Sequence, residues 1–101
     1  MRGAALTAAP GGRWVLGGVL DFSTVPTVWP TLEKLIQSGG AVTVSLSEVR
    51  QTNSAGLVML VEARDLARRS NCQLELVDIP AEMLALARMS RCETLLSRNA
   101  A

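Results

Sequence analysis

The residue whose type and position best suit chemistry is Ser54, in the segment AVTVSLSEVRQTNSAGLVML. An alternating strand pattern there passes through a short polar loop into a helical pattern, and the serine falls in the first turn of the expected helix. A first helical turn presents unpaired N–H groups and the positive end of the helix dipole, which favour a phosphoryl group or a partner's carboxylate. Ser54 is therefore a candidate for recognition or modification.

Three roles are open to Ser54. As a helix N-cap, its hydroxyl would accept a backbone N–H and contribute about 1 kcal/mol, a purely structural role. As a catalytic nucleophile it would need a base, but the chain has no histidine, and its single lysine, Lys34, lies in another expected helix. As an exposed contact or phosphoacceptor it needs only access, and Ala55 and Gly56 allow close approach by another protein. We favour this last role and expect no enzymatic activity.

Helical geometry separates two faces of the expected helix, which runs from Asn53 or Ser54 to Arg69. At about 100° per residue, one stripe should pack on a sheet. This core stripe comprises Gly56, Met59, Leu60, Ala63, Leu66 and Ala67. The opposite face and its edges include Ser54, Leu57, Val58, Val61, Arg64, Asp65 and Arg68. Exposed valines beside a serine indicate a protein interface, although single exposed apolar residues are also ordinary. The predicted partner-binding residues are Asn53, Ser54, Leu57, Val58, Val61 and Asp65.

The first third of the chain predicts a hairpin followed by a helix. Strand residues around Leu6 and Thr7 precede a Pro-Gly-Gly turn, and residues 13–19 form the second strand, where Gly17-Gly18 could shift the register through a bulge. Residues 24–37 then carry apolar side chains at helical spacing. Because Pro30 inside a helix removes a hydrogen bond, we expect that helix to start late, near Thr27.

Strands and helices alternate in the rest of the chain. Apolar residues alternate over residues 42–46, the helix of Ser54 follows, residues 73–77 form the next strand, and Pro80 introduces a last helix with a possible further turn at 92–96. Such strand–helix–strand units predict parallel pairing and right-handed crossovers. The expected fold is a single α/β domain over residues 1–101, with a mixed sheet of about four strands covered by helices.

Composition excludes several classes of function. Ten basic against nine acidic residues give a net charge of +1, and aromatic residues make up 3%, so neither nucleic-acid binding nor base stacking is expected. The longest uncharged run, Leu35–Ser47, is too short to span a membrane, and residues 1–6 do not resemble a signal peptide. Without histidine, the distant Cys72 and Cys92 are expected to pack rather than bind metal. We expect a soluble cytoplasmic protein without cofactor or metal.

The segment SLSEVRQTNSAGLVMLVEA resembles the motif of STAS domains, the family of anti-sigma-factor antagonists, in which an Asp-Leu-Ser strand end leads through a short loop to Asp-Ser-x-Gly-Leu. Leu20-Asp21, the helix from Thr24, QLELVDIP and ALARMSRCETLL follow the order of that family, so the resemblance covers about residues 13–97. Within the family, SAGL, LVEARDLARR and PAEMLALA are most similar to the MlaB-like subunits of ABC-type phospholipid transporters, which maintain outer-membrane lipid asymmetry.

This resemblance implies a SpoIIAA-like STAS fold and a non-catalytic accessory subunit, held peripherally at the inner membrane, that docks on the MlaF-like ATPase of a transporter with a membrane permease. Ser54 matches the hydroxyl residue of the family, which is phosphorylated in sigma-factor switches and lies at the ATPase contact in MlaB-like proteins. Ser45 and Asn53 stand where the family has aspartates, which favours constitutive docking over a phosphorylation cycle. The alternatives are an anti-sigma-factor antagonist switched by phosphorylation of Ser54, and a domain holding a lipid or nucleotide in a groove beside the same helix.

Overall fold

The computed structural model describes residues 3–92, 94 and 96 of the 101-residue chain. In chain order its elements are β1 (Ala4–Ala9), the 3-10 turn η1 (Pro10–Gly12), β2 (Arg13–Leu20), α1 (Val25–Gln37), β3 (Gly40–Thr52), α2 (Ser54–Arg69), β4 (Cys72–Val77) and α3 (Ala81–Met89). The expected sequence of hairpin, helix, strand, helix, strand and helix is confirmed.

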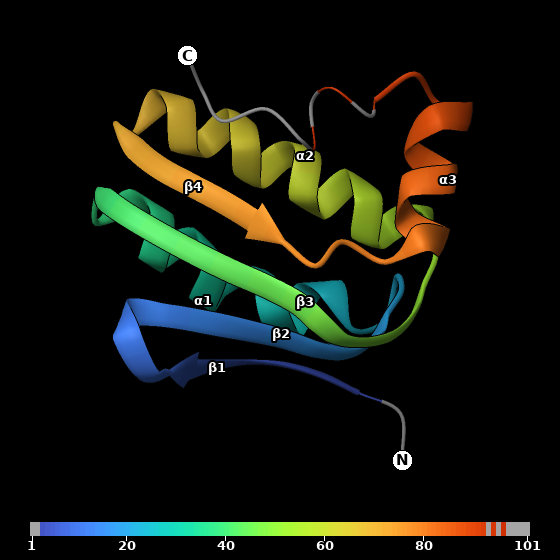
Figure 1. Cartoon of the computed structure of the whole chain (residues 1–101), viewed down its shortest axis with the longest axis horizontal. Helices are drawn as coiled ribbons and strands as arrows, with labels where there is room; N and C mark the ends of the chain where they lie inside the picture. Colours follow the sequence, from blue (N-terminus) through green and yellow to red (C-terminus); the bar gives the residue numbers. More distant parts are fainter. Residues whose placement is uncertain (1–2, 93, 95, 97–101) are drawn as a thin grey trace.

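The four strands form one mixed sheet in the order β1-β2-β3-β4. β1 pairs antiparallel with β2, whereas the β2–β3 and β3–β4 pairs are parallel. Both crossovers step in the same direction across the sheet, so right-handed connections place α1 and α2 on the same face (Figure 1). α3 lies at one end of this layer, beside the start of α2 (Figure 1). The α/β architecture with a mixed four-stranded sheet is as predicted from the sequence.

The core lies between the sheet and the α1–α2 layer. Strand alternation supplies one side of it, because every second side chain of β3 points toward the helices. Its fully enclosed members include Leu16, Leu20, Leu32, Ile36, Val44, Leu46, Leu60, Leu74 and Met83. The predicted sheet-facing stripe of α2 is confirmed, since each of its residues is buried.

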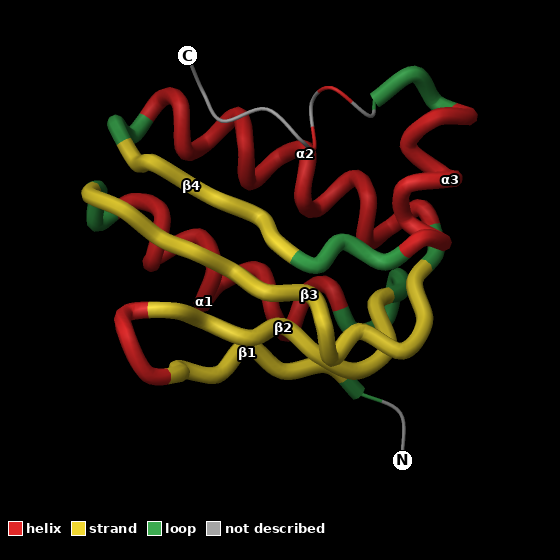
Figure 2. The backbone as a smooth tube through the Cα atoms, viewed as in Figure 1, coloured by secondary structure: helices red, strands yellow, loops and turns green. Residues whose placement is uncertain are grey.

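β3 is longer than the sequence pattern indicates. The polar residues 47–52, expected as a loop, continue the strand because they pair with the second half of β2, from Gly17↔Glu48 to Leu20↔Thr52. Two register shifts interrupt this pairing, between Val15 and Gly17 and between Gly18 and Val19, as the glycine pair predicted. β3 therefore bends at its carboxyl end before entering α2 (Figure 2).

The late start expected for the first helix is wrong, because α1 begins at Val25 and contains Pro30. Its first turn is built by the preceding loop: Val25 N–H donates to the Asp21 carbonyl at 3.0 Å, and Thr27 N–H donates to the Thr24 carbonyl at 2.9 Å. Pro26 sits in that first turn, where a missing N–H costs little. α1 continues through Pro30 with Val28, Leu32 and Ile36 buried on one face, and this burial favours the helix on both sides of the proline.

The last helical turn expected at 92–96 is found in part. Thr94 and Leu96 are helical, Leu96 is fully buried, and its N–H donates to the Cys92 carbonyl at 3.2 Å. Residues 93 and 95 lie outside the described residues.

Candidate docking site

The start of α2 is capped by Asn53, not by Ser54. The Asn53 side-chain oxygen accepts the Ala55 N–H at 2.8 Å, and its backbone carbonyl accepts the Gly56 N–H at 3.1 Å. Ser54, the first helical residue, is exposed. Because Asn53 fills the cap position, the N-cap role for Ser54 is excluded, and its hydroxyl faces solvent at the positive end of α2.

The junction before Ser54 is tied to both neighbouring elements. Asn53 N–H donates to the Leu20 carbonyl at 3.1 Å, and Thr52 N–H donates to the Glu82 carboxylate of α3 at 3.2 Å. Thr52 Oγ1 in turn donates to the Asn53 carbonyl at 3.0 Å. The position of Ser54 is therefore set by the end of β2, the end of β3 and the start of α3 together.

Gly56 lets α2 approach the sheet closely enough for this junction to form. A Cβ atom at residue 56 would lie far inside contact distance of Thr52 Oγ1 and 3.0 Å from Leu20 Cβ. No larger residue fits there without moving α2. The glycine that the sequence suggested for close approach by a partner serves instead for internal packing.

The loop between β2 and α1 stands beside this junction. The Asp21 carboxylate accepts the Ser23 hydroxyl at 2.7 Å and the N–H groups of Ser23 and Thr24 at 2.9 and 3.1 Å. These bonds, chiefly the one from the Ser23 hydroxyl, lower the pKa of Asp21. Thr24 Oγ1 donates to the Val19 carbonyl at 2.7 Å, so the loop is well ordered while it projects Phe22 outward, 75% exposed.

Not all six predicted partner-binding residues lie at the surface. Asn53, Ser54 and Val58 are exposed, and Val61 and Asp65 are half-buried. Asp65 accepts from Arg68 and from Arg69, which together lower its pKa. The prediction that Leu57 is exposed is wrong, since its side chain is 3% exposed.

Arg64, placed by the sequence at the edge of the outer face, is also buried, at 8% exposure. Its guanidinium donates to the Leu74 carbonyl at 2.7 Å and to the Leu96 carbonyl at 3.0 and 2.6 Å. Burial lowers the pKa of Arg64, with Glu75 acting in the opposite direction. The expected outer face is narrower than predicted because α3 and the turn containing Leu96 cover one flank of α2.

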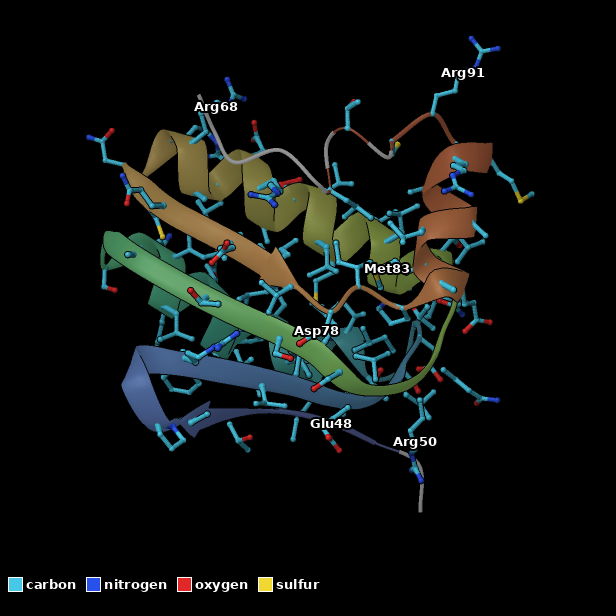
Figure 3. The ribbon with its side chains drawn as sticks, viewed as in Figure 1. Glu48, Arg50, Arg68, Asp78, Met83 and Arg91 are labelled. Atoms are coloured by element: carbon cyan, nitrogen blue, oxygen red, sulfur yellow. The ribbon has the colours of Figure 1, made fainter. Side chains whose placement is uncertain are left out.

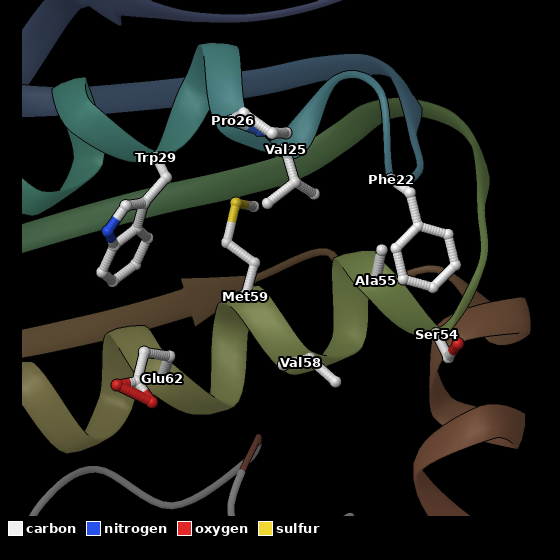
Figure 4. Close-up of a pocket in the computed structure, with 9 residues that line it drawn as sticks. All are labelled: Phe22, Val25, Pro26, Trp29, Ser54, Ala55, Val58, Met59 and Glu62. Carbon is white, nitrogen blue, oxygen red and sulfur yellow. The ribbon is translucent and has the colours of Figure 1, made fainter.

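A groove opens on the other flank of α2, against α1. Its volume is about 470 Å³. The lining residues are Phe22, Val25, Pro26, Trp29, Ser54, Ala55, Val58, Met59 and Glu62 (Figure 4). Ser54 and Val58 were expected at the site, whereas Phe22, Trp29 and Glu62 were not. The sequence did contain a signal for Phe22. It is a large apolar residue in the short polar segment between β2 and α1, where a buried side chain is not expected.

The remaining reactive groups are structural. Ser45, in the middle of β3, donates to Asp78, the residue directly after β4, at 2.9 Å, and the Ser47 hydroxyl lies 3.0 Å from that of Ser45 (Figure 3). Cys72 is buried, which raises the pKa of its thiol, and the Cys92 thiol donates to the Ser90 carbonyl. In the described ranges, no three His, Cys, Asp or Glu residues gather in a way that could hold a metal ion.

The family of the chain follows from comparison with known proteins. The family model described as Mlab, STAS domain, matches residues 8–97. The chain belongs to this STAS domain family. No curated protein matched it. None of the helices among the described residues has the length and apolar character that crossing a bilayer requires.

Solved structures show the same fold. The anti-sigma factor antagonist SpoIIAA in its unphosphorylated form aligns over 97% of this chain and 88% of its own, with a TM-score of 0.68 and 13% identity. A crystal structure of Mglu aligns over 76% of this chain with a TM-score of 0.59 and 19% identity. This STAS domain spans about a fifth of the length of the Mglu chain, since 20% of that chain is covered. The SpoIIAA-like STAS fold expected from the motif is confirmed.

Proposed function

We propose that this STAS domain is a non-catalytic accessory subunit of an ABC-type phospholipid transport system that maintains outer-membrane lipid asymmetry. It is cytoplasmic, peripheral to the inner membrane, and binds and supports the MlaF-like ATPase subunit beneath the permease. The observation that carries this proposal is the match of residues 8–97 to the Mlab STAS family. The exposed Ser54, held rigidly and without a histidine in the chain to activate it, is consistent with docking rather than catalysis.

In this proposal the contact centres on Ser54, with Asn53, Val58 and Val61 around it and Asp65 at its far edge. Leu57 supports the contact from beneath, because its side chain is buried in the core. Ser54 and Val58 lie at the centre of this proposed contact, where water is excluded when an interface closes, so a charge introduced there is costly.

Binding to the purified ABC ATPase subunit of the same organism tests the proposal. Ser54→Glu and Val58→Asp each place a charge where a close apolar contact is expected, so each should weaken binding by about tenfold or more. Circular dichroism and melting should stay nearly unchanged, because both side chains are exposed. Equal ATPase binding by the wild type and both variants would contradict the proposal.

One observation favours a second function. The fold matches SpoIIAA over nearly the whole chain, and the hydroxyl of Ser54 is exposed rather than engaged in capping. An anti-sigma-factor antagonist would accept one phosphate on Ser54 from a serine kinase. Intact mass after incubation with ATP and the anti-sigma kinases of the same organism tests this, with Ser54→Ala as control. A phosphate gain lost in Ser54→Ala, together with no ATPase binding, would favour the switch.

A further inference from the structure

The α1–α2 groove gathers exposed apolar surface. Phe22 is 75% exposed and Val58 is 64% exposed, and both line it. Met89, on α3, is the only other large apolar side chain that is exposed among the described residues. Two such residues line one hollow, and Trp29 and Met59 continue its apolar lining further from Phe22 (Figure 4), which indicates a contact that is completed by another molecule.

The dimensions of the groove fit a helix. Along α2 it extends from Ser54 to Glu62, a rise of eight residue steps or about 12 Å, which corresponds to about two turns of a helix lying alongside. Its walls are the helices α1 and α2, so a third helix can pack between them with its side-chain ridges in the groove. A small-molecule pocket encloses most of its ligand, whereas Phe22 and Val58 leave the rim of this groove open to solvent.

The charges of the lining select the chemistry of the occupant. Among the described residues that line the groove, Glu62 is the only charged one, and it lies at the end away from Ser54. Its carboxylate attracts Lys or Arg and repels the phosphate of a phospholipid. The opposite end is the positive N-terminus of α2, which favours the carboxyl end of a partner helix.

We propose that this groove binds an amphipathic helix of the ATPase subunit, antiparallel to α2, an inference that rests on the proposed function for the identity of the partner. Apolar side chains spaced three and four residues apart contact Phe22, Trp29 and Val58, and a Lys or Arg of the same helix pairs with Glu62. This contact extends the docking site from Ser54 toward α1, a direction that the outer face of α2 alone does not indicate.

Charge reversal tests the pairing with the purified ATPase subunit as the probe. Glu62→Arg should weaken binding by about tenfold. The matched control is Glu48→Arg, which makes the same change at an exposed residue of β3 outside the groove and should leave affinity within about twofold (Figure 3). Met89→Asp, compared with Val58→Asp, gives the corresponding control for the apolar contact.

A photoreactive benzoylphenylalanine in place of Trp29 then locates the partner segment by mass spectrometry. We expect crosslinks to a helical segment of the ATPase that carries Lys or Arg. Replacing that cation by Glu should restore binding to the Glu62→Arg variant, which a merely structural effect of Glu62→Arg would not allow.

The outcomes separate the two proposals. If the ATPase binds but Glu62→Arg has no effect and residue 29 gives no crosslink to it, the helix inference is overturned and the proposed function stands. If the wild type does not bind the ATPase, both are overturned. Crosslinks to a second copy with a doubled mass in light scattering, or a phospholipid retained in native mass spectrometry and displaced by Val58→Asp, would overturn the inference in favour of that occupant.

Discussion

Substitution of Arg64 tests how much a single buried side chain contributes to the stability of this fold. It lies on α2, 8% exposed, and its guanidinium joins the outer strand β4 at the Leu74 carbonyl to the C-terminal turn at the Leu96 carbonyl. A free edge strand carries unpaired carbonyl groups, and Arg64 satisfies one of them from within the molecule. Arg64→Met keeps an unbranched, flexible apolar side chain in place of the aliphatic part of the arginine and removes every donor.

The expected loss follows from these contacts. A hydrogen bond to a charged group contributes about 1.5–3 kcal/mol, and two carbonyl groups lose such a donor. Water recovers part of this energy at the sheet edge, so the free energy of unfolding should fall by about 2–4 kcal/mol. In a domain of this size each kcal/mol lowers the melting temperature by roughly 4–8 °C.

Thermal and urea unfolding of three variants would measure the effect. Arg68→Met is the matched control, because the Arg68 side chain is 66% exposed and pairs with Asp65 at the surface, where an ion pair contributes about 0–1 kcal/mol. The loss of stability in Arg64→Lys should lie between the losses in Arg64→Met and Arg68→Met, since an ammonium group cannot reach both the Leu74 and the Leu96 carbonyl. If the free energy of unfolding of Arg64→Met is within about 0.5 kcal/mol of the wild-type value, the hydrogen bonds to these carbonyls do not stabilise the fold, and the reasoning is refuted.

Three further predictions concern α2. Gly56→Ala should lower stability by about 1–2 kcal/mol in urea titration, because the clash with Thr52 exceeds the gain of about 1 kcal/mol in helix propensity; a stabilised variant would show that α2 can shift. Leu60→Ala, in the core, should cost about 2–5 kcal/mol by the same assay, against little change for Val58→Ala. Asp65 has a lowered pKa in the folded state, so its contribution is present above the ordinary value of 3.8 and is lost as the pH falls through the lowered value. The urea midpoints of wild type and Asp65→Asn should therefore differ at neutral pH and converge in acid, once the pH is below the lowered pKa of Asp65; a difference that persists there would contradict this.

Local periodicity was sufficient to predict most of the fold. The alternation through Val42, Val44 and Leu46, and the apolar stripe of α2, depend only on which side chains share a face, so element type and order followed directly. The glycine pair 17–18 predicted the register shifts in β2 because glycine readily adopts the backbone angles of an irregular strand, and Gly18 has a φ of 96°. By contrast, the polar segment 47–52 gave no strand signal, since it is held as a strand by pairing with β2.

The errors at the candidate site share one cause. Leu57 and Arg64 were placed on an outer face because helical geometry identifies the two sides of α2 but not how many neighbours the helix has. α3 and the turn containing Leu96 cover the flank of Arg64, and this cover comes from residues about thirty positions later in the chain. The sequence raised a groove beside this helix only as an alternative and did not identify its lining, because Phe22 and Glu62 come to line one groove only after α1 and α2 pack together.

The two departures from the STAS motif have different consequences in the structure. At Ser45 the missing carboxylate is replaced by that of Asp78, which directly follows the neighbouring strand β4 and accepts the Ser45 hydroxyl at 2.9 Å. At Asn53 the amide caps α2 through Ala55 and itself adds no negative charge beside Ser54, while the Glu82 carboxylate of α3 is held by the Thr52 N–H. The positive end of α2 is therefore not neutralised from its own loop, and a carboxylate or a helix C-terminus of a partner gains more by binding there.

Asn53→Asp keeps the cap and adds the charge, so in our proposal it should weaken ATPase binding while leaving the melting temperature nearly unchanged. Tighter binding in that variant would mean that the partner brings a cation to Ser54, and it would reverse the helix direction inferred for the groove.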